Sequence, residues 1–231
     1  MELDLNEIKE KLVDRLRPSG WADKLKGFIL SSDFDKIIGD LYTLSRKGKK
    51  FTPVLKQVFR AFEECPWNDL QVVMIGQDPY PTMYVADGIA FSCGNTKKVQ
   101  PSLDYMFQAL TADGITHSSD PDLTRWSNQG ILLLNYSFTC EIGKPGTHYH
   151  IWKDFMAYTL DIINSYNKGL VFVFMGKKAQ ELAPLIGDQH HKIMTFHPIS
   201  AGYSGTQWDS KDCFNQINKI LKEQTKTQII W

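Results

Sequence analysis

Four short apolar runs separated by helical segments constrain the fold of this chain more than any other feature. The runs are Val72–Ile75, Ile131–Leu134, Leu170–Met175 and Ile193–Phe196. Continuous apolar runs of this length are typical of strands buried on both faces, and their alternation with helices favours a mostly parallel sheet. The pattern predicts an α/β fold with helices on both faces of the sheet. The covering helices are expected at Ser102–Thr111, Trp152–Ser165, Lys178–Ile186 and Asp209–Lys222.

The remainder of the chain is expected to belong to the same domain. With 231 residues and 42% hydrophobic content, one α/β domain or two small ones agree with the size, and we favour one domain over 1–231. Apolar positions recur at helical spacing from Leu5 to about Leu44, so 1–50 should form packing helices, and another helix should end near Glu64. The tail 225–231 has no assigned structure. A docked or disordered end is expected there, with a sliding clamp as an alternative contact for Gln228–Trp231.

Charge and cysteine usage exclude several classes of protein. The 26 basic residues balance the 26 acidic ones, so any contact with nucleic acid has to be local. The four cysteines stand far apart without a Cys-x-x-Cys pair, which indicates reduced thiols. The sequence has no signal core, no transit pattern and no apolar run near the roughly 20 residues that span a bilayer. We expect a cytoplasmic protein, or a nuclear one in a eukaryote, without membrane contact.

The residues that follow the apolar runs carry chemical groups that packing does not require. Asp78 closely follows the first run, while Asn135 and His197 directly follow the second and the fourth. Ligands of open α/β sheets bind outside the carboxyl ends of the strands. Singly, Asn135 could satisfy a strand end and His197 could cap a turn, but gathering an acid, an amide and an imidazole costs desolvation. Together the three residues predict a binding crevice.

The segment Gly76–Thr82 is suited to holding Asp78 in one place. Gly76 permits a tight exit from the strand, and Pro79 and Pro81 fix the backbone φ angle on either side of Tyr80. For this segment alone, an ordinary turn with a helix cap is an alternative. Downstream, Phe91 is either part of the core or a flat face on which a base can stack.

Other familiar sites are missing from the sequence. The five further histidines lack the spacing to carboxylates or thiols that metal ligands show, so no metal is expected. The sequence contains no Gly-x-Gly-x-x-Gly, no Walker loop and no Gly-x-Ser-x-Gly elbow, which disfavours dinucleotide, nucleoside triphosphate and ordinary acyl-hydrolase functions. No cofactor is expected.

Five motifs, in this order along the chain, resemble those of the uracil-DNA glycosylase family. They are Gly76-Gln77-Asp78-Pro79-Tyr80, Gly88-Ile89-Ala90-Phe91-Ser92, Pro101-Ser102-Leu103, Leu132-Leu133-Leu134-Asn135 and His197-Pro198, within a match from about Val72 to Phe214. The first motif is highly specific for this family. Each of the others is moderately specific alone, and together they are persuasive because they occur in this order. The resemblance implies a single-domain three-layer sandwich with a four-stranded parallel sheet flanked by helices. It also implies a DNA repair enzyme that flips uracil out of DNA and hydrolyses its N-glycosidic bond without metal or cofactor.

The resemblance assigns a role to each matching residue. It implies that Asp78 positions the attacking water and stabilises an oxocarbenium-like sugar, while His197 stabilises the departing uracil anion. It further implies that Asn135 pairs with the edge of uracil, Phe91 stacks on the ring and Tyr80 fills the space that a thymine methyl needs. Gln77 would shape the pocket through its backbone. The residues expected to contact DNA are Pro101, Ser102, Lys177, Ser200, Ala201 and Tyr203.

Three positions depart from the family pattern. Pro81 stands where the family usually has His, and Lys177 stands where it usually has Ser. Ungapped counting places Ala201 at the position of a Leu wedge that enters the duplex. Alanine is too small to fill a vacated base stack. We therefore expect Tyr203 or Ile199 to supply the wedge, or duplex activity to be weak.

The sequence also bears on partners and on rival functions. The expected partner of a monomeric enzyme is uracil-containing DNA, single- or double-stranded, and a sliding clamp or a proteinaceous glycosylase inhibitor is a further candidate. The rivals are a non-catalytic DNA-binding relative, a nucleotide-processing hydrolase and a glycosylase with altered base choice. The presence of Asp78, Asn135 and His197 disfavours a non-catalytic relative. The lack of a phosphate-binding Gly loop disfavours a nucleotide-processing hydrolase. Tyr80 and Asn135 disfavour a glycosylase with altered base choice.

Overall fold

A four-stranded parallel sheet lies at the centre of the protein. The computed structural model describes residues 4–231. The strands are β2 (Val72–Gly76), β3 (Ile131–Asn135), β5 (Val171–Met175) and β6 (His191–Thr195), in the order β3-β2-β5-β6. Every residue of β2 and β5 is buried, as expected for strands covered on both faces. The predicted single-domain α/β sandwich is confirmed.

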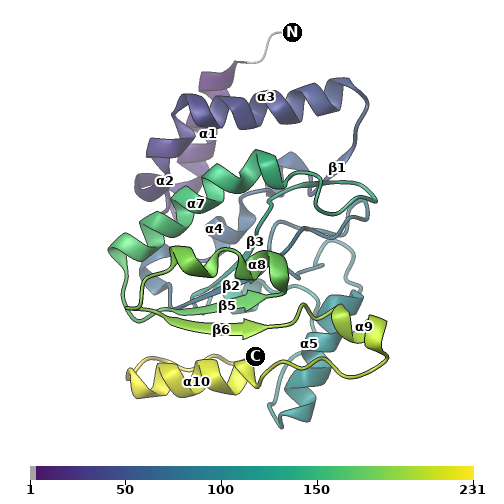
Figure 1. Ribbon diagram of the computed structural model, residues 1–231. Helices are drawn as coiled ribbons and strands as arrows, with labels where there is room; N and C mark the ends of the chain where they lie inside the picture. Colours follow the sequence, from purple (N-terminus) through teal and green to yellow (C-terminus); the bar gives the residue numbers. More distant parts are fainter. Residues whose placement is uncertain (1–3) are drawn as a thin grey trace.

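Helices form the two outer layers of the sandwich. Figure 1 shows α7 (Tyr149–Tyr166) and α8 (Lys177–Gln180) on one side of the sheet and α10 (Cys213–Glu223) on the other. The N-terminal helices pack beyond α7, and α5 and α9 lie near the carboxyl ends of the strands. The remaining helices are α1 (Leu5–Leu16), α2 (Ala22–Ile29), α3 (Ser32–Arg46), α4 (Arg60–Glu64), α5 (Pro101–Ala112), α6 (Thr124–Ser127) and α9 (Ser200–Ser204). A two-residue pair, β1 (Phe51–Thr52) with β4 (Cys140–Glu141), lies apart from the sheet.

Three predicted helices are shorter in the structure or are divided. The helix predicted over Lys178–Ile186 ends at Gln180 and is followed by a 3-10 turn, Ala183–Leu185, because Pro184 cannot continue the helical hydrogen bonds. The helix predicted from Asp209 begins at Cys213, because Lys211 and Asp212 have positive φ angles. The helix predicted to end near Glu64 is split into the 3-10 turn Leu55–Gln57 and α4.

The C-terminal tail is docked on the protein. Trp231 is buried, and its ring centroid lies 4.8 Å from that of Phe214 and 5.1 Å from that of Trp126. The backbone N–H of Ser118 donates to the carbonyl of Trp231. The end of the chain therefore packs against the protein, and the side chain of Trp231 is part of the hydrophobic core.

Two further expectations concern cysteines and membranes. All four cysteines are buried and free of disulfides. Across residues 4–231, the helices are too short or too polar to cross a bilayer.

Candidate active site

The carboxyl ends of the strands meet at one pocket. Asn135 ends β3 and pairs in register with Gly76, the last residue of β2, while His197 follows β6 by two residues. The pocket has a volume of about 540 Å³. Its lining includes all six residues predicted to bind or cleave the base: Gln77, Asp78, Tyr80, Phe91, Asn135 and His197.

Gly76 keeps the floor of the pocket open. A Cβ atom at this position would lie 2.8 Å from Asn135 Oδ1 and 2.9 Å from Phe91 Cζ, closer than such atoms can approach. The backbone of β2 therefore lets the amide and the ring lie beside each other. Within residues 4–231 the side-chain amide of Asn135 has no protein partner, so its donor and its acceptor are both available to a ligand.

Asp78 is held through one of its two carboxylate oxygens. The Tyr149 hydroxyl donates to Oδ2 at 2.7 Å, and Gln77 Nε2 donates to the same oxygen at 3.1 Å. The other oxygen, Oδ1, is buried and has no hydrogen-bond partner among the described residues. The carboxylate is thus oriented on one side and has a free acceptor on the other.

Burial raises the pKa of Asp78 above its ordinary value. The hydrogen bonds from Tyr149 and Gln77 and the nearby backbone of Gly146 act in the opposite direction, because they stabilise the charged form. The Lys178 ammonium also lowers the pKa of Asp78. It lies 4.5 Å from the ring centroid of Tyr136 and 4.7 Å from that of Tyr149, where both rings attract the cation.

The surroundings of His197 favour the neutral form of its ring with the proton on Nε2. The backbone N–H of Ile199 donates to its Nδ1 at 3.3 Å, so the proton of the neutral ring is on Nε2. Desolvation by burial lowers the pKa of His197 to about 4. At Gly176, which has a φ of 90°, a Cβ would lie 2.8 Å from the Cβ of His197, so the end of β5 packs closely against this histidine.

Phe91 and Tyr80 are fixed relative to each other. The Tyr80 hydroxyl donates to the backbone carbonyl of Phe91 at 3.0 Å. The Phe91 ring is buried and its centroid lies 5.8 Å from that of His197. Two aromatic side chains thus bound the pocket beside the Asn135 amide.

The residues predicted to contact DNA fall into two groups. Pro101, Ser102, Ser200 and Tyr203 line the pocket, and Tyr203 on α9 is 87% exposed. Lys177 is exposed in the first turn of α8 but is not among the pocket-lining residues. Ala201 is only 2% exposed, so its methyl group packs inside the protein, and the DNA contact expected at this position stays a prediction. Ile199 also lines the pocket.

Sequence reasoning missed Tyr149 and Lys178 as parts of the site. Tyr149 begins α7, far from the motifs, and only folding brings its hydroxyl to Asp78. Lys178 is adjacent to the predicted Lys177, and the direction of its side chain depends on the helical geometry of α8. No group of three or more His, Cys, Asp or Glu side chains that could hold a metal ion occurs in residues 4–231.

Comparisons with known proteins agree in one family. The Uracil DNA glycosylase superfamily matches residues 62–222. The uracil-DNA glycosylase of Buchnera aphidicola subsp. Baizongia pistaciae is 38% identical over 220 residues, which cover 91% of this chain and 96% of that protein. That of Acinetobacter baumannii strain SDF is 31% identical, with coverage of 97% and 98%.

Solved structures give the same result. The crystal structure of mimivirus uracil-DNA glycosylase superposes with a TM-score of 0.85 at 25% identity, covering 95% of this chain and 88% of that one. A variant of the mimivirus protein, solved in complex with UGI, has a TM-score of 0.85 and covers 95% of this chain and 90% of that one.

The protonation state of His197 can be measured directly. Because burial lowers the pKa of this histidine to about 4, we expect its ring to stay neutral from about pH 5 to pH 8, with the proton on Nε2. Long-range ¹H–¹⁵N NMR spectra report both the charge and the tautomer, and the variant His197→Gln assigns the signal. A ring that becomes protonated near the ordinary histidine pKa would contradict this assignment.

Proposed function

Because this chain belongs to the Uracil DNA glycosylase superfamily, we propose that its pocket takes up a uracil base from DNA and hydrolyses the bond between that base and its deoxyribose. The products are free uracil and an abasic site in the DNA. This hydrolysis is the first step in the repair of uracil in DNA. One observation carries the proposal: a carboxylate, an amide and an imidazole from three parallel strand ends line one pocket together with an aromatic ring.

Recognition of uracil rests on Asn135. Its amide places a donor and an acceptor side by side, which matches the O4 and the N3–H of uracil and mismatches cytosine. Phe91 stacks on the ring, a general way of holding an extracted base. Tyr80, held by its hydrogen bond to the Phe91 carbonyl, fills the space that the methyl group of thymine needs.

Bond cleavage begins at Asp78. The free Oδ1 accepts a hydrogen bond from the attacking water, while Tyr149 and Gln77 hold Oδ2 and thereby fix the direction of the carboxylate. The water oxygen bonds to C1′ of the sugar as the bond from C1′ to N1 of uracil breaks. Asp78 takes up the proton that the water loses, and the uracil anion gains a proton from solvent to leave as the free base. The negative charge of Asp78 stabilises the oxocarbenium-like sugar that develops in between.

His197 stabilises the leaving group. The electron pair of the broken bond departs with uracil, so negative charge grows on the base and its O2 oxygen. A neutral Nε2–H of His197 donates a hydrogen bond to that oxygen, and in a dry pocket such a donor counts for more than in water. Because its pKa is about 4, His197 carries no second proton near neutral pH, and it stabilises the leaving base as a hydrogen-bond donor and not as a general acid.

Contacts with the DNA backbone are proposed at the rim of the pocket. Pro101 and Ser102, at the start of α5, and Ser200, at the start of α9, line the pocket and can approach phosphates. Lys177 is exposed nearby on α8 and adds a positive charge for a phosphate. The exposed ring of Tyr203 is the proposed wedge that fills the space left by the flipped base.

Two protein partners remain proposals. A proteinaceous inhibitor would bind across the same rim, as the complex of the mimivirus variant with UGI suggests by similarity. A sliding clamp could contact only part of the C-terminal tail. Ile230 is exposed, whereas the side chains of Ile229 and Trp231 are buried. We also propose that the enzyme acts as a monomer, since the pocket already contains a carboxylate, an amide, an imidazole and a stacking ring without a second copy.

The proposed function is tested with two matched single-stranded oligonucleotides, one carrying uracil and one carrying thymine, in the presence of a chelator. Cutting by alkali should occur only at the uracil position. Asp78→Asn and His197→Leu should each lower the rate by about 10² to 10⁴, as for other positioned catalytic groups. Asp161→Asn, on the exposed face of α7, serves as the control and should keep the rate of the unmodified protein. Near-native rates in both site variants would refute the mechanism, and DNA binding without cutting would favour the non-catalytic relative.

The pH profile tests the role of Tyr149. The activity requires the charged form of Asp78, and the Tyr149 hydrogen bond lowers the pKa of that group. Tyr149→Phe removes this hydrogen bond, so the pKa of Asp78 rises and the acid limb of kcat/KM moves to higher pH. The control is Tyr136→Phe, whose lost hydroxyl has no hydrogen bond to Asp78 within residues 4–231, and it should leave the limb in place. An acid limb unchanged by Tyr149→Phe would remove Tyr149 from the mechanism.

The wedge role of Tyr203 is tested by comparing rates on duplex and single-stranded DNA. A wedge offsets part of the unstacking cost, which amounts to a few kcal/mol per base step. Tyr203→Ala should therefore lower the rate on duplex by about tenfold and leave the rate on single strands nearly unchanged. Tyr166→Ala, which removes an exposed tyrosine at the far end of α7, is the matched control. An unchanged ratio of the two rates would exclude Tyr203.

A further inference from the structure

The backbone segment that presents Phe91 to the pocket has an unusual conformation. Residues 84–94 form neither helix nor strand, and Phe91 has a φ of 66°, a left-handed conformation that is uncommon for a bulky side chain. Tyr84 and Gly88 also have positive φ angles, of 64° and 93°. A segment without a regular hydrogen-bond ladder needs other contacts to stay in one conformation.

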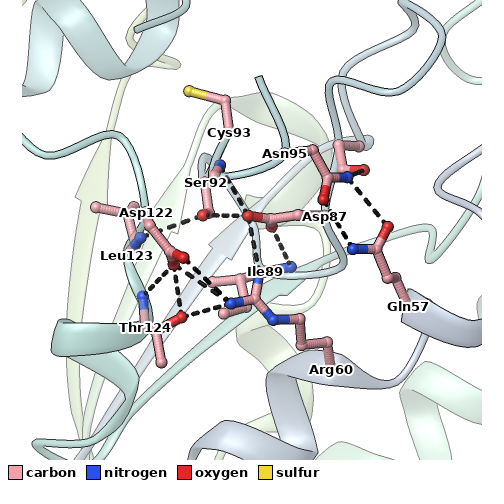
Figure 2. Close-up of polar contacts among 12 residues, drawn as sticks. Gln57, Arg60, Asp87, Ile89, Ser92, Cys93, Asn95, Asp122, Leu123 and Thr124 are labelled. Carbon is pink, nitrogen blue, oxygen red and sulfur yellow. Dashed lines mark hydrogen bonds and ion pairs between the residues drawn. The ribbon is translucent and has the colours of Figure 1, made fainter. Parts of the chain in front are cut away.

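The carboxylate of Asp87 supplies contacts on both sides of Phe91. Asp87 is fully buried. Its Oδ1 accepts from the backbone N–H of Ile89 at 3.2 Å, and its Oδ2 accepts from Ser92 Oγ at 2.6 Å and from the backbone N–H of Gly94 at 3.0 Å. Figure 2 shows these bonds converging on one side chain. The carboxylate thus ties together residues before and after Phe91.

Arg60 anchors that carboxylate to the body of the protein. Its Nη1 lies 2.9 Å from Asp87 Oδ2, and its Nη2 donates to Thr124 Oγ1 at 2.6 Å (Figure 2). The guanidinium therefore connects α4, the segment around Asp87 and the start of α6. Its planar fork suits several fixed partners at once, which the ammonium of Lys could not match.

The loop also touches the 3-10 turn before α4. Asn95 and Gln57 exchange two side-chain hydrogen bonds, at 2.9 and 3.1 Å. Gly88 approaches this turn so closely that a Cβ would lie 1.7 Å from the carbonyl oxygen of Gln57. Residues 84–94 therefore pack closely against the 3-10 turn that precedes α4, the helix that carries Arg60.

We propose that Asp87 and Arg60 are positioning residues that hold Phe91 in place for the base. Neither residue is among those that line the pocket, whereas Phe91, Ile89 and Ser92 are. Asp87 therefore acts through the backbone of the loop and not on the substrate. The proposal rests on the proposed function, because it takes Phe91 as the stacking surface for uracil.

A buried ion pair of this kind is not required for stability alone. Well-packed apolar residues often replace such pairs without loss of stability, whereas removing one partner leaves an uncompensated group. The carboxylate at Asp87 instead accepts four donors, two of them backbone N–H groups that fix the path of the loop on either side of Phe91. Its geometry sets the orientation of the ring.

The test is a double-mutant cycle between Asp87→Asn and Phe91→Ala, read as the affinity for free uracil. The Asn amide must turn its NH₂ toward a donor, so we expect the dissociation constant for uracil to rise about tenfold, within the range that stacking on one base provides. In the Phe91→Ala background, Asp87→Asn should cause no further loss, because the ring through which it acts is gone. Glu64→Gln is the control, since Glu64 contacts the same guanidinium at 3.3 Å and, among residues 4–231, has no hydrogen bond or ion pair with residues 84–94.

Each outcome of the cycle decides the proposal. Native affinity in a folded Asp87→Asn variant, or an equal loss with and without Phe91, would overturn it. Thermal unfolding monitors the fold, and if Asp87→Asn does not fold, the same cycle is run with Ser92→Ala, which removes one of the four donors. An additive loss there would also overturn the proposal. Uracil affinity is measured by direct titration, so failure of the wild-type protein to release uracil from DNA would refute the proposed function separately.

Discussion

Burial of the Asp78 carboxylate is the constraint on which the arrangement of this pocket depends. A charged group taken out of water loses hydration, and burial alone would favour its protonated form. The protein offsets this with donors on one oxygen, Tyr149 and Gln77, and with the nearby Lys178 ammonium. The other oxygen has no hydrogen-bond partner among the described residues and keeps its capacity to accept one. The hydrogen bonds that stabilise the charged carboxylate therefore also fix its orientation.

The same physical cause acts with the opposite sign on His197. Burial disfavours the charged form of an imidazole as well, so the pKa of His197 falls while that of Asp78 rises. The ring needs no counter-charge, and a single backbone N–H from Ile199 is enough to select its tautomer. In the proposed mechanism, one pocket thus combines a carboxylate for the developing positive sugar with a neutral donor for the developing uracil anion.

Part of this site could be predicted from the sequence, and the reasons for success and failure differ between residues. Asp78, Asn135 and His197 each follow an apolar run, and parallel strands bring their carboxyl ends to one edge. Tyr149 and the Asp87–Arg60 pair follow no such rule, because their contacts join segments that are distant in sequence. The burial of Ala201 could not be predicted either, because a small residue in a short helix does not indicate which face of that helix is buried.

The most direct test of the central claim is a crystal structure of the protein with free uracil and an abasic oligonucleotide bound together. We predict that the Asn135 amide pairs with O4 and N3–H of uracil, that His197 Nε2 donates to O2, and that Asp78 Oδ1 contacts a water beside C1′ of the abasic sugar. Uracil bound through another edge, or Asp78 Oδ1 bonded to the base in place of the water, would contradict this account.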